Sequence, residues 1–255
     1  MSELISNRVP KIILLYWVIK ISSTTLGETG ADMFSMTFDL GYGVTILIFL
    51  GIFLSLLAVK LKLSEYNALA YWSTFTASAI AGTAICDFID RTLGLGYTIG
   101  SVLLLLLLGI VLVIWHLTEG SLSVERITSN RHELFYWLAF LVANTLGTAA
   151  GDSVADDLEL GFMLSAGIFS ALLLAIVLMH YFTKISWIVL FWLAFVLTRP
   201  FGATFGDFLT KPISEGGLNL GTIGASLFFL LVMLAALAWE SKHKKEVVET
   251  VLVLD

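Results

Sequence analysis

The chain has 255 residues, of which 58% are hydrophobic and only 13% are charged, and its mean hydropathy is +0.94. A soluble globular domain carries about 25% charged residues, so this composition excludes an ordinary soluble domain and indicates a protein that crosses a membrane several times. The formal net charge is −6. The single cysteine, Cys86, excludes an intramolecular disulfide framework and a cysteine-cluster metal site. The polar first ten residues resemble no cleavable signal peptide.

Eight apolar segments follow along the chain, and we expect each to be a transmembrane helix. They cover residues 12–29, 43–60, 67–86, 97–117, 134–151, 162–182, 186–206 and 219–239. A helix of about 20 residues crosses the ~30 Å hydrocarbon core of a bilayer. The predicted fold class is therefore an all-α membrane protein with eight transmembrane helices and a single domain over residues 1–255.

The first, third, fifth and seventh segments carry the same pattern, in which a Gly and an Asp follow an aromatic-Trp pair by 11 and 16 residues. The four copies are Tyr16-Trp17 with Gly27 and Asp32, Tyr71-Trp72 with Gly82 and Asp87, Tyr136-Trp137 with Gly147 and Asp152, and Phe191-Trp192 with Gly202 and Asp207. Each copy ends in a short link with a Leu-Gly pair before the next segment, where the Gly suits a tight turn. The period predicts four parallel helical hairpins, at about residues 11–62, 66–118, 131–183 and 186–241, around an axis along the membrane normal. The Asp residues of alternate copies are 120 residues apart, which indicates a duplicated four-helix half.

This tandem hairpin, with its aromatic-Trp start, its Thr-Leu-Gly and Asp core and its Leu-Gly-Tyr link, resembles the bacterial integral-membrane family built from four copies of the domain of unknown function 347 repeat. The resemblance covers residues 10–240 and implies eight spans in a bacterial membrane, with no binding or catalytic residues to transfer. The fourth copy departs from the pattern, with Phe191 in place of Tyr and an Arg199-Pro200 pair.

The charges predict an orientation. An even number of spans places both termini on one side, and that side carries ten of the fourteen basic residues, namely Arg8, Lys11, Lys60, Lys62, Arg126, Arg131, Lys184, Lys242, Lys244 and Lys245. The positive-inside rule then places the termini in the cytoplasm. Eleven of the twenty acidic residues lie toward the opposite side, which would concentrate cations there.

Polar residues four apart form one stripe on each odd-numbered segment. The stripe residues that we single out as a candidate ion- or substrate-binding site are Lys20, Thr24, Glu28, Asp32, Asp87, Asn144, Asp152, Arg199 and Asp207. Such a stripe must face protein or water in a bilayer, so we expect the four stripes to meet at a central cavity or at paired interfaces. Glu28 is the deepest acid and the natural partner for Lys20 or Arg199.

A structural reading stays open beside the functional one. The four repeated Asp residues would then be struts, paired with Arg91, Lys211 or backbone amides. We interpret the repeated Gly residues as close-packing positions between helices. We interpret the repeated Trp residues as an aromatic belt at the membrane interface.

The sequence favours a small secondary transporter or exporter of a cationic solute, coupled to protons or another ion. Oxygen ligands without a Cys or His cluster suit a proton, Na⁺, Mg²⁺, Mn²⁺, Ca²⁺ or an organic cation. A metal ion would be held by Glu28, Asp32 and Asp152, while Lys20 and Arg199 leave an anionic substrate open. We expect no catalytic residues, no organic cofactor and no nucleic-acid partner. The partners would be the lipid bilayer and the solute, and an oligomer stays open. The alternative is a membrane scaffold or sensor whose buried charges are structural pairs.

Overall fold

The computed structural model describes residues 8–63, 65–122, 127 and 129–254, with the backbone alone for residues 243–254. These residues form eight α-helices and contain no strand. The helices are α1 (Leu14–Asp32), α2 (Gly41–Lys60), α3 (Ala68–Asp87), α4 (Tyr97–Glu119), α5 (Asn130–Asp152), α6 (Gly161–Phe182), α7 (Trp187–Thr210) and α8 (Thr222–Leu254).

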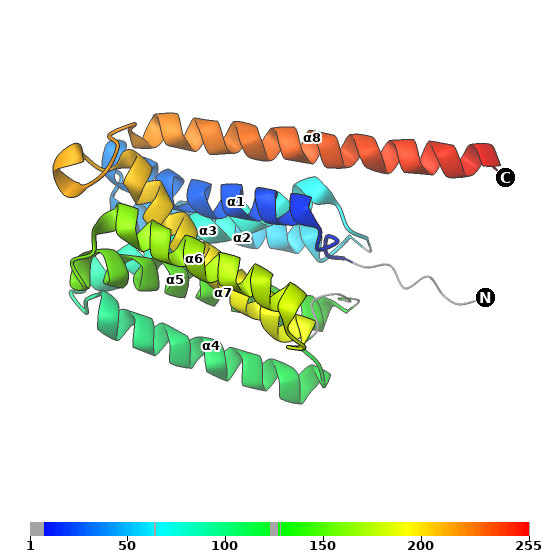
Figure 1. Cartoon of the computed structure of the whole chain (residues 1–255), viewed down its shortest axis with the longest axis horizontal. Helices are drawn as coiled ribbons and strands as arrows, with labels where there is room; N and C mark the ends of the chain where they lie inside the picture. Colours follow the sequence, from blue (N-terminus) through cyan, green and yellow to red (C-terminus); the bar gives the residue numbers. More distant parts are fainter. Residues whose placement is uncertain (1–7, 64, 123–126, 128, 255) are drawn as a thin grey trace.

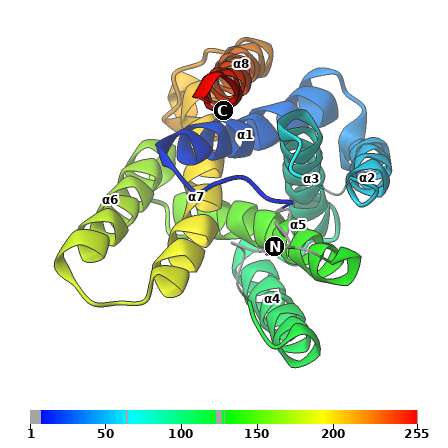
Figure 2. The same ribbon diagram turned by 90° about the vertical axis from the view of Figure 1, so that its right-hand side faces the viewer.

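The four odd-numbered helices form an inner ring. Helix α1 packs on α3 and α7, and α5 packs on the same two helices from the opposite side. The even-numbered helices lie outside the ring, with α2 on α3, α4 on α5, α6 on α7 and α8 on α1 (Figure 2). Thus the second helix of each hairpin packs on the first helix of the next hairpin, and α8 closes the circle on α1. The four repeats are interlocked rather than merely adjacent.

Burial follows this division. Half or more of the candidate membrane span is buried in the inner helices α5 (72%) and α7 (50%), against 22% for the outer helix α2. Within the described part of the chain, six helices are long and apolar enough to cross a membrane: α2, α4, α5, α6, α7 and α8. Helices α1 and α3 do not meet the same measure, because they carry many polar residues that pack against protein. The all-helical fold is confirmed, and the spanning role of all eight helices stays a prediction.

The links alternate between the two ends of the bundle. The links within hairpins lie at one end, and the joins between hairpins lie at the other end with the end of α8 (Figure 1). The Gly of each Leu-Gly link has a positive φ, which a residue with a Cβ adopts only at a cost. These are Gly41 (φ 71°), Gly96 (76°), Gly161 (71°) and Gly221 (75°). The predicted tight turns before the even-numbered helices are confirmed.

Three inner helices change their winding directly after the repeated Asp. A five-residue π-helical turn follows α1, α3 and α5, at Met33–Thr37, Phe88–Thr92 and Ser153–Asp157. The fourth copy lacks this turn, because α7 runs on to Thr210 and a short 3₁₀ turn follows at Ile213–Glu215. Short π-helical segments occur often at functional sites. Here they separate the buried Asp residues from the links.

The repeated Gly residues set the distance between neighbouring inner helices. A Cβ on Gly27 would lie 2.6 Å from the Cβ of Ala79 on α3, and one on Gly202 would lie 2.6 Å from Oγ1 of Thr24 on α1. Gly147 lies in the same way against the side chain of Arg199 on α7. In each case the neighbour stands eight residues after the aromatic start of the next repeat. The close-packing interpretation is therefore correct.

The aromatic-belt interpretation is wrong for two of the four Trp residues. Trp72 and Trp137 are fully buried, whereas Trp17 and Trp192 are half-buried. The ring of Trp137 lies 6.4 Å, centroid to centroid, from that of Phe53 on α2. The outer helices cover these positions of the ring, so the aromatic pairs fill the interior at this end of the bundle.

Candidate functional site

The polar residues of the inner ring are stacked in layers, because equivalent positions of the four repeats face the same centre. The layer nearest the aromatic starts contains Lys20, Phe75, Phe140 and Phe195. The Lys20 ammonium lies 3.7 Å from the centroid of the Phe195 ring and 5.4 Å from that of Phe75. It donates to the Phe195 carbonyl at 3.1 Å and to Oγ1 of Thr198 at 2.5 Å. Aromatic rings and neutral oxygens thus surround this buried amino group, and among the described residues no carboxylate pairs with it.

Beyond it lies the clamp layer, formed by Glu28, Thr83 and Thr148, which stand eight residues further along their helices, and by the guanidinium of Arg199, which stands four residues beyond Phe195. Nη2 of Arg199 is 3.2 Å from Oε2 of Glu28 and donates to Oγ1 of Thr148 at 2.7 Å and to Oγ1 of Thr83. The two hydroxyls also lie 3.3 Å and 3.4 Å from the Glu28 carboxylate. Nη1 of Arg199 donates to the Thr24 carbonyl at 3.1 Å. One ion pair with its hydrogen bonds therefore joins all four inner helices.

The aspartate layer, formed by Asp32, Asp87, Asp152 and Asp207, lies one turn beyond the clamp. All four side chains are buried. The Lys211 ammonium lies 2.7 Å from Oδ2 of Asp32 and 3.3 Å from Oδ1 of Asp207. Nε of Arg91 lies 3.3 Å from Oδ1 of Asp87. Two cations thus form ion pairs with three of the four carboxylates.

Asp152 is the exception. Its side chain is 1% exposed, and among the described residues neither of its carboxylate oxygens has a hydrogen-bond partner. The charged groups that act on it most strongly are Glu28, Asp207 and Asp87, which are all acids. A buried carboxylate without a partner is costly, so such a group takes up a proton or a cation. The centre of the ring therefore contains an acid that the protein itself does not neutralise.

The structure brings most of the predicted site residues to one axis. Glu28 and Arg199 are in contact, Thr24 accepts from Arg199 through its backbone, and the four Asp residues share a layer. Asn144 instead donates to Oγ of Ser78 at 3.0 Å, which joins α5 to α3. Of the two cations predicted as a partner for Glu28, Arg199 pairs with it, whereas Lys20 lies two turns away and donates to Phe195 and Thr198 instead.

The predicted metal ligands do not come together. Among the described residues, no group of three His, Cys, Asp or Glu side chains is placed to hold a metal ion. Glu28 is paired with Arg199, and Asp32 is paired with Lys211, so two of the three predicted ligands already have a cation beside them.

Sequence reasoning misses a second buried ion cluster at the end where the repeats join. The Lys60 ammonium, which is fully buried, lies 2.9 Å from Oε1 of Glu133, and Nη1 of Arg8 lies 3.0 Å from Oε2 of the same residue. Lys60 ends α2 and Glu133 lies in the first turn of α5, so the cluster ties the first repeat to the third. By sequence alone, Lys60 counts only as a basic residue of a cytoplasmic link. The pattern offers one signal, namely that both charges border long apolar segments.

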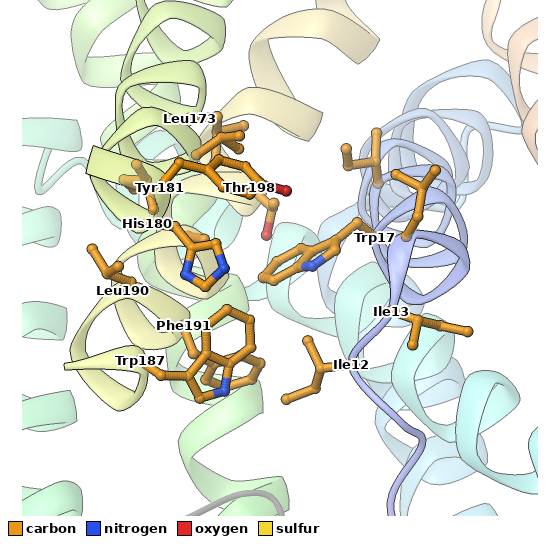
Figure 3. Close-up of a pocket in the computed structure, with 15 residues that line it drawn as sticks. Ile12, Ile13, Trp17, Leu173, His180, Tyr181, Trp187, Leu190, Phe191 and Thr198 are labelled. Atoms are coloured by element: carbon orange, nitrogen blue, oxygen red, sulfur yellow. The ribbon is translucent and has the colours of Figure 1, made fainter. Parts of the chain in front are cut away.

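A separate pocket of about 390 Å³ opens between α1, α6 and α7, near the end where the repeats join (Figure 3). Its lining is mostly apolar and aromatic, with Trp17, His180 and Trp187 around it and Thr198 among its few polar residues. Thr198 is also the residue that accepts from Lys20. The pocket therefore reaches the layer that contains Lys20, through Thr198, without entering the clamp layer.

Comparison with known proteins agrees with the repeat structure. No curated protein and no solved structure matches the chain. A family model described as Repeat of Unknown Function (DUF347) matches it four times, at residues 15–66, 70–121, 135–186 and 190–245. Each match covers one helical hairpin of the ring, and together they span most of the chain. The chain therefore belongs to the DUF347 repeat family, in a form with four tandem copies.

Proposed function

We propose that the protein is a small secondary transporter of a cationic solute, coupled to protons and operating through the layered acids of its inner ring. In this proposal all eight helices span the membrane, and the ring axis lies along the membrane normal. The inner helices α1 and α3 cross without an apolar surface of their own, because the ring and the outer helices cover them. Parallel repeats with charges near the midplane are typical of transporters.

The observation that carries the proposal is the unpartnered, buried carboxylate of Asp152. A scaffold gains nothing from such a group, since an Asn or Ala at this position would avoid the cost of burying it. A transporter that exchanges protons for a cation needs an acid that changes its charge state. Asp152 is the residue of the aspartate layer that fits this need, because the other three acids already have cations beside them.

The clamp layer supplies the barrier in this proposal. Arg199 and Glu28 close the ring through contacts to all four inner helices, so a solute cannot pass while the pair is intact. A cation that reaches Glu28 competes with Arg199 for the carboxylate. The released guanidinium keeps the hydrogen bonds that it already donates to the hydroxyls of Thr83 and Thr148.

The arrangement favours protons and organic cations over hard divalent metal ions. A divalent ion requires several oxygen ligands at once, and the described acids are not grouped in that way. A proton needs one carboxylate, and an organic cation needs one or two. The solute class in the proposal is therefore a monovalent or organic cation.

The proposed location is the bacterial inner membrane, with both termini in the cytoplasm. The segment before α1, the joins before α3 and α7 and the start of α5 lie at the end where the repeats join (Figure 1), and they contain Lys11, Lys62, Lys184 and Arg131. The positive-inside rule assigns such a basic end to the cytoplasm. Arg8 and Lys60 support it less, because they are paired with Glu133. Arg126, Lys244 and Lys245 also belong to the predicted set, and their side chains lie outside the described residues.

A membrane scaffold or sensor is the second candidate. The cluster of Arg8, Lys60 and Glu133 and the clamp of Glu28 and Arg199 favour it, since both join helices that are distant in sequence. A scaffold leaves Asp152 without a role. Flux therefore separates the two candidates.

The test uses purified protein in proteoliposomes with an imposed pH gradient. We expect uptake or release of an organic or monovalent cation that depends on the gradient and is lost when the gradient is collapsed with an ionophore. A series of alkylammonium ions, Na⁺ and K⁺ provides the solutes, and Mg²⁺ and Mn²⁺ provide the comparison. Absence of flux for every cation, with protein that is folded and correctly inserted, would leave the scaffold as the function.

A further inference from the structure

The Lys211 ammonium lies between two carboxylates of the aspartate layer, in the position that a bound cation would take. It is the first residue after α7, where the backbone becomes extended at φ −67° and ψ 156°. Its side chain turns back into the ring and places one ammonium 2.7 Å from Asp32 on α1 and 3.3 Å from Asp207 on α7. It is 14% exposed, against 1% for the Arg199 side chain in the clamp. The Lys211 ammonium therefore lies at the boundary between the aspartate layer and solvent.

The ammonium at this position is charged. Burial lowers the pKa of Lys211, but the carboxylates of Asp207 and Asp32 outweigh burial and raise the pKa above its ordinary value. A charged primary ammonium has three donors and no acceptor. Two carboxylates from two helices, with an opening toward solvent, accept such a group well. The pair would suit a quaternary ammonium less, since that group has no N–H to donate.

The charges of the layer leave room for a further cation. Lys211 and Arg91 supply two positive charges against the four carboxylates of the aspartate layer. The fourth acid, Asp152, is buried, and among the described residues both of its oxygens are without a hydrogen-bond partner; the charged groups that act on it are three acids, Glu28, Asp207 and Asp87, and one cation, Arg91. A solute cation that enters the layer therefore meets a net negative charge even while Lys211 is in place.

We propose that Asp32 and Asp207 form a binding site for the primary ammonium group of a solute, and that Lys211 occupies this site as a tethered substitute when no solute is bound. The proposal rests on the transport function for its biological meaning, and it narrows the solute to a compact alkylammonium or a polyamine. An arriving ammonium displaces that of Lys211 toward solvent. The tether then returns when the solute leaves, so the carboxylates are never left without a cation.

Chemical rescue tests this inference without a transport assay. Lys211→Ala removes the tethered ammonium, and we expect the midpoint of thermal unfolding in detergent to fall by about 5 °C, since two buried carboxylates lose their partner. Ethylammonium chloride should restore at least half of this loss, while tetramethylammonium chloride at the same ionic strength should restore none. Lys184→Ala is the matched control, because Lys184 is exposed, and we expect neither a loss nor a rescue.

A loss that no ammonium ion restores, or that both ions restore equally, would show that Lys211 is a structural strut and would overturn the proposal. If Lys211→Ala does not fold in plain buffer, the same comparison is made during purification. Recovery of folded protein in ethylammonium alone supports the site, and equal recovery in both salts or in neither overturns it. Rescue without flux would leave the ammonium site standing and remove the transporter, so the two proposals fail separately.

Discussion

The guanidinium of Arg199 on α7 and the carboxylate of Glu28 on α1 form a buried ion pair with N···O 3.2 Å, 171 residues apart in the chain. Removing one partner of such a pair leaves the other charged and without compensation, which costs about 3–5 kcal/mol. We therefore expect Glu28→Ala to lower the free energy of unfolding by this amount. The measurement is reversible denaturation in detergent micelles.

The double variant Glu28→Ala with Arg199→Ala provides the control. Both charges are then absent. We therefore expect the double variant to lose less unfolding free energy than the two single variants lose together, by at least about 1 kcal/mol. Strict additivity in this double-mutant cycle would mean that the two side chains do not interact, and the clamp would have to be abandoned.

The aspartate layer predicts opposite effects for two equivalent residues. Asp152→Asn removes a charge that has no partner, so we expect it to leave stability unchanged or to raise it by about 1 kcal/mol. Asp207→Asn removes a partner of Lys211 and should lower stability. Thermal unfolding of the two variants side by side checks this. Equal destabilisation by both substitutions would indicate that Asp152 has a structural partner.

The buried cluster at the other end of the ring predicts a large effect from one substitution. Glu133→Ala leaves Lys60, which is fully buried, without a counterion, and we expect a loss of about 3–5 kcal/mol in the free energy of unfolding. Lys62→Ala, two residues beyond Lys60 and exposed, serves as the comparison and should change little. A loss below about 1 kcal/mol for Glu133→Ala would show that water reaches Lys60.

Helix spacing in the ring gives a prediction that involves no charge. In Gly147→Ala the new methyl group would overlap the side chain of Arg199, and we expect a cost of about 1–3 kcal/mol from overpacking. On the outer helix α4, a methyl group added at Gly109 would meet no neighbour within 4 Å, so Gly109→Ala should be neutral or stabilising by up to about 1 kcal/mol. Unfolding of the two variants in the same detergent compares them directly. Similar effects would contradict the close approach at Gly147.

Much of the fold could be predicted because it depends on period and polarity. The 11- and 16-residue spacings of Gly27 and Asp32 from Tyr16 recur four times, and they define both the hairpins and the inward face of the odd-numbered helices. The link Gly residues are also local features, since a positive φ is a property of a single turn. Equivalent positions of the repeats then lie in common layers.

The pairings could not be predicted, because they depend on which hairpin follows which around the ring. The order of the ring places Thr83 and Thr148 beside Glu28, and it places Lys211 of the fourth repeat beside Asp32 of the first. Composition suggests only that Lys20 or Arg199 pairs with Glu28. The register of the inner helices pairs Arg199 with Glu28 and places the Lys20 side chain over the Phe195 ring.

The buried position of Trp72 escapes prediction for the same reason. An aromatic residue at the end of an apolar segment is typical of a membrane interface. Only the interlocking of the hairpins shows that another helix covers it.

Proton movement in proteoliposomes that contain the Asp152→Asn variant tests whether Asp152 carries the coupled proton. Asp156→Asn is the matched control, because Asp156 lies one turn further on and is exposed. With a cation that the wild type transports, we expect wild type and Asp156→Asn to move protons against the cation at similar rates, and Asp152→Asn to lose proton movement by at least tenfold while it remains folded. Proton-coupled flux in Asp152→Asn equal to that of the wild type would contradict the account.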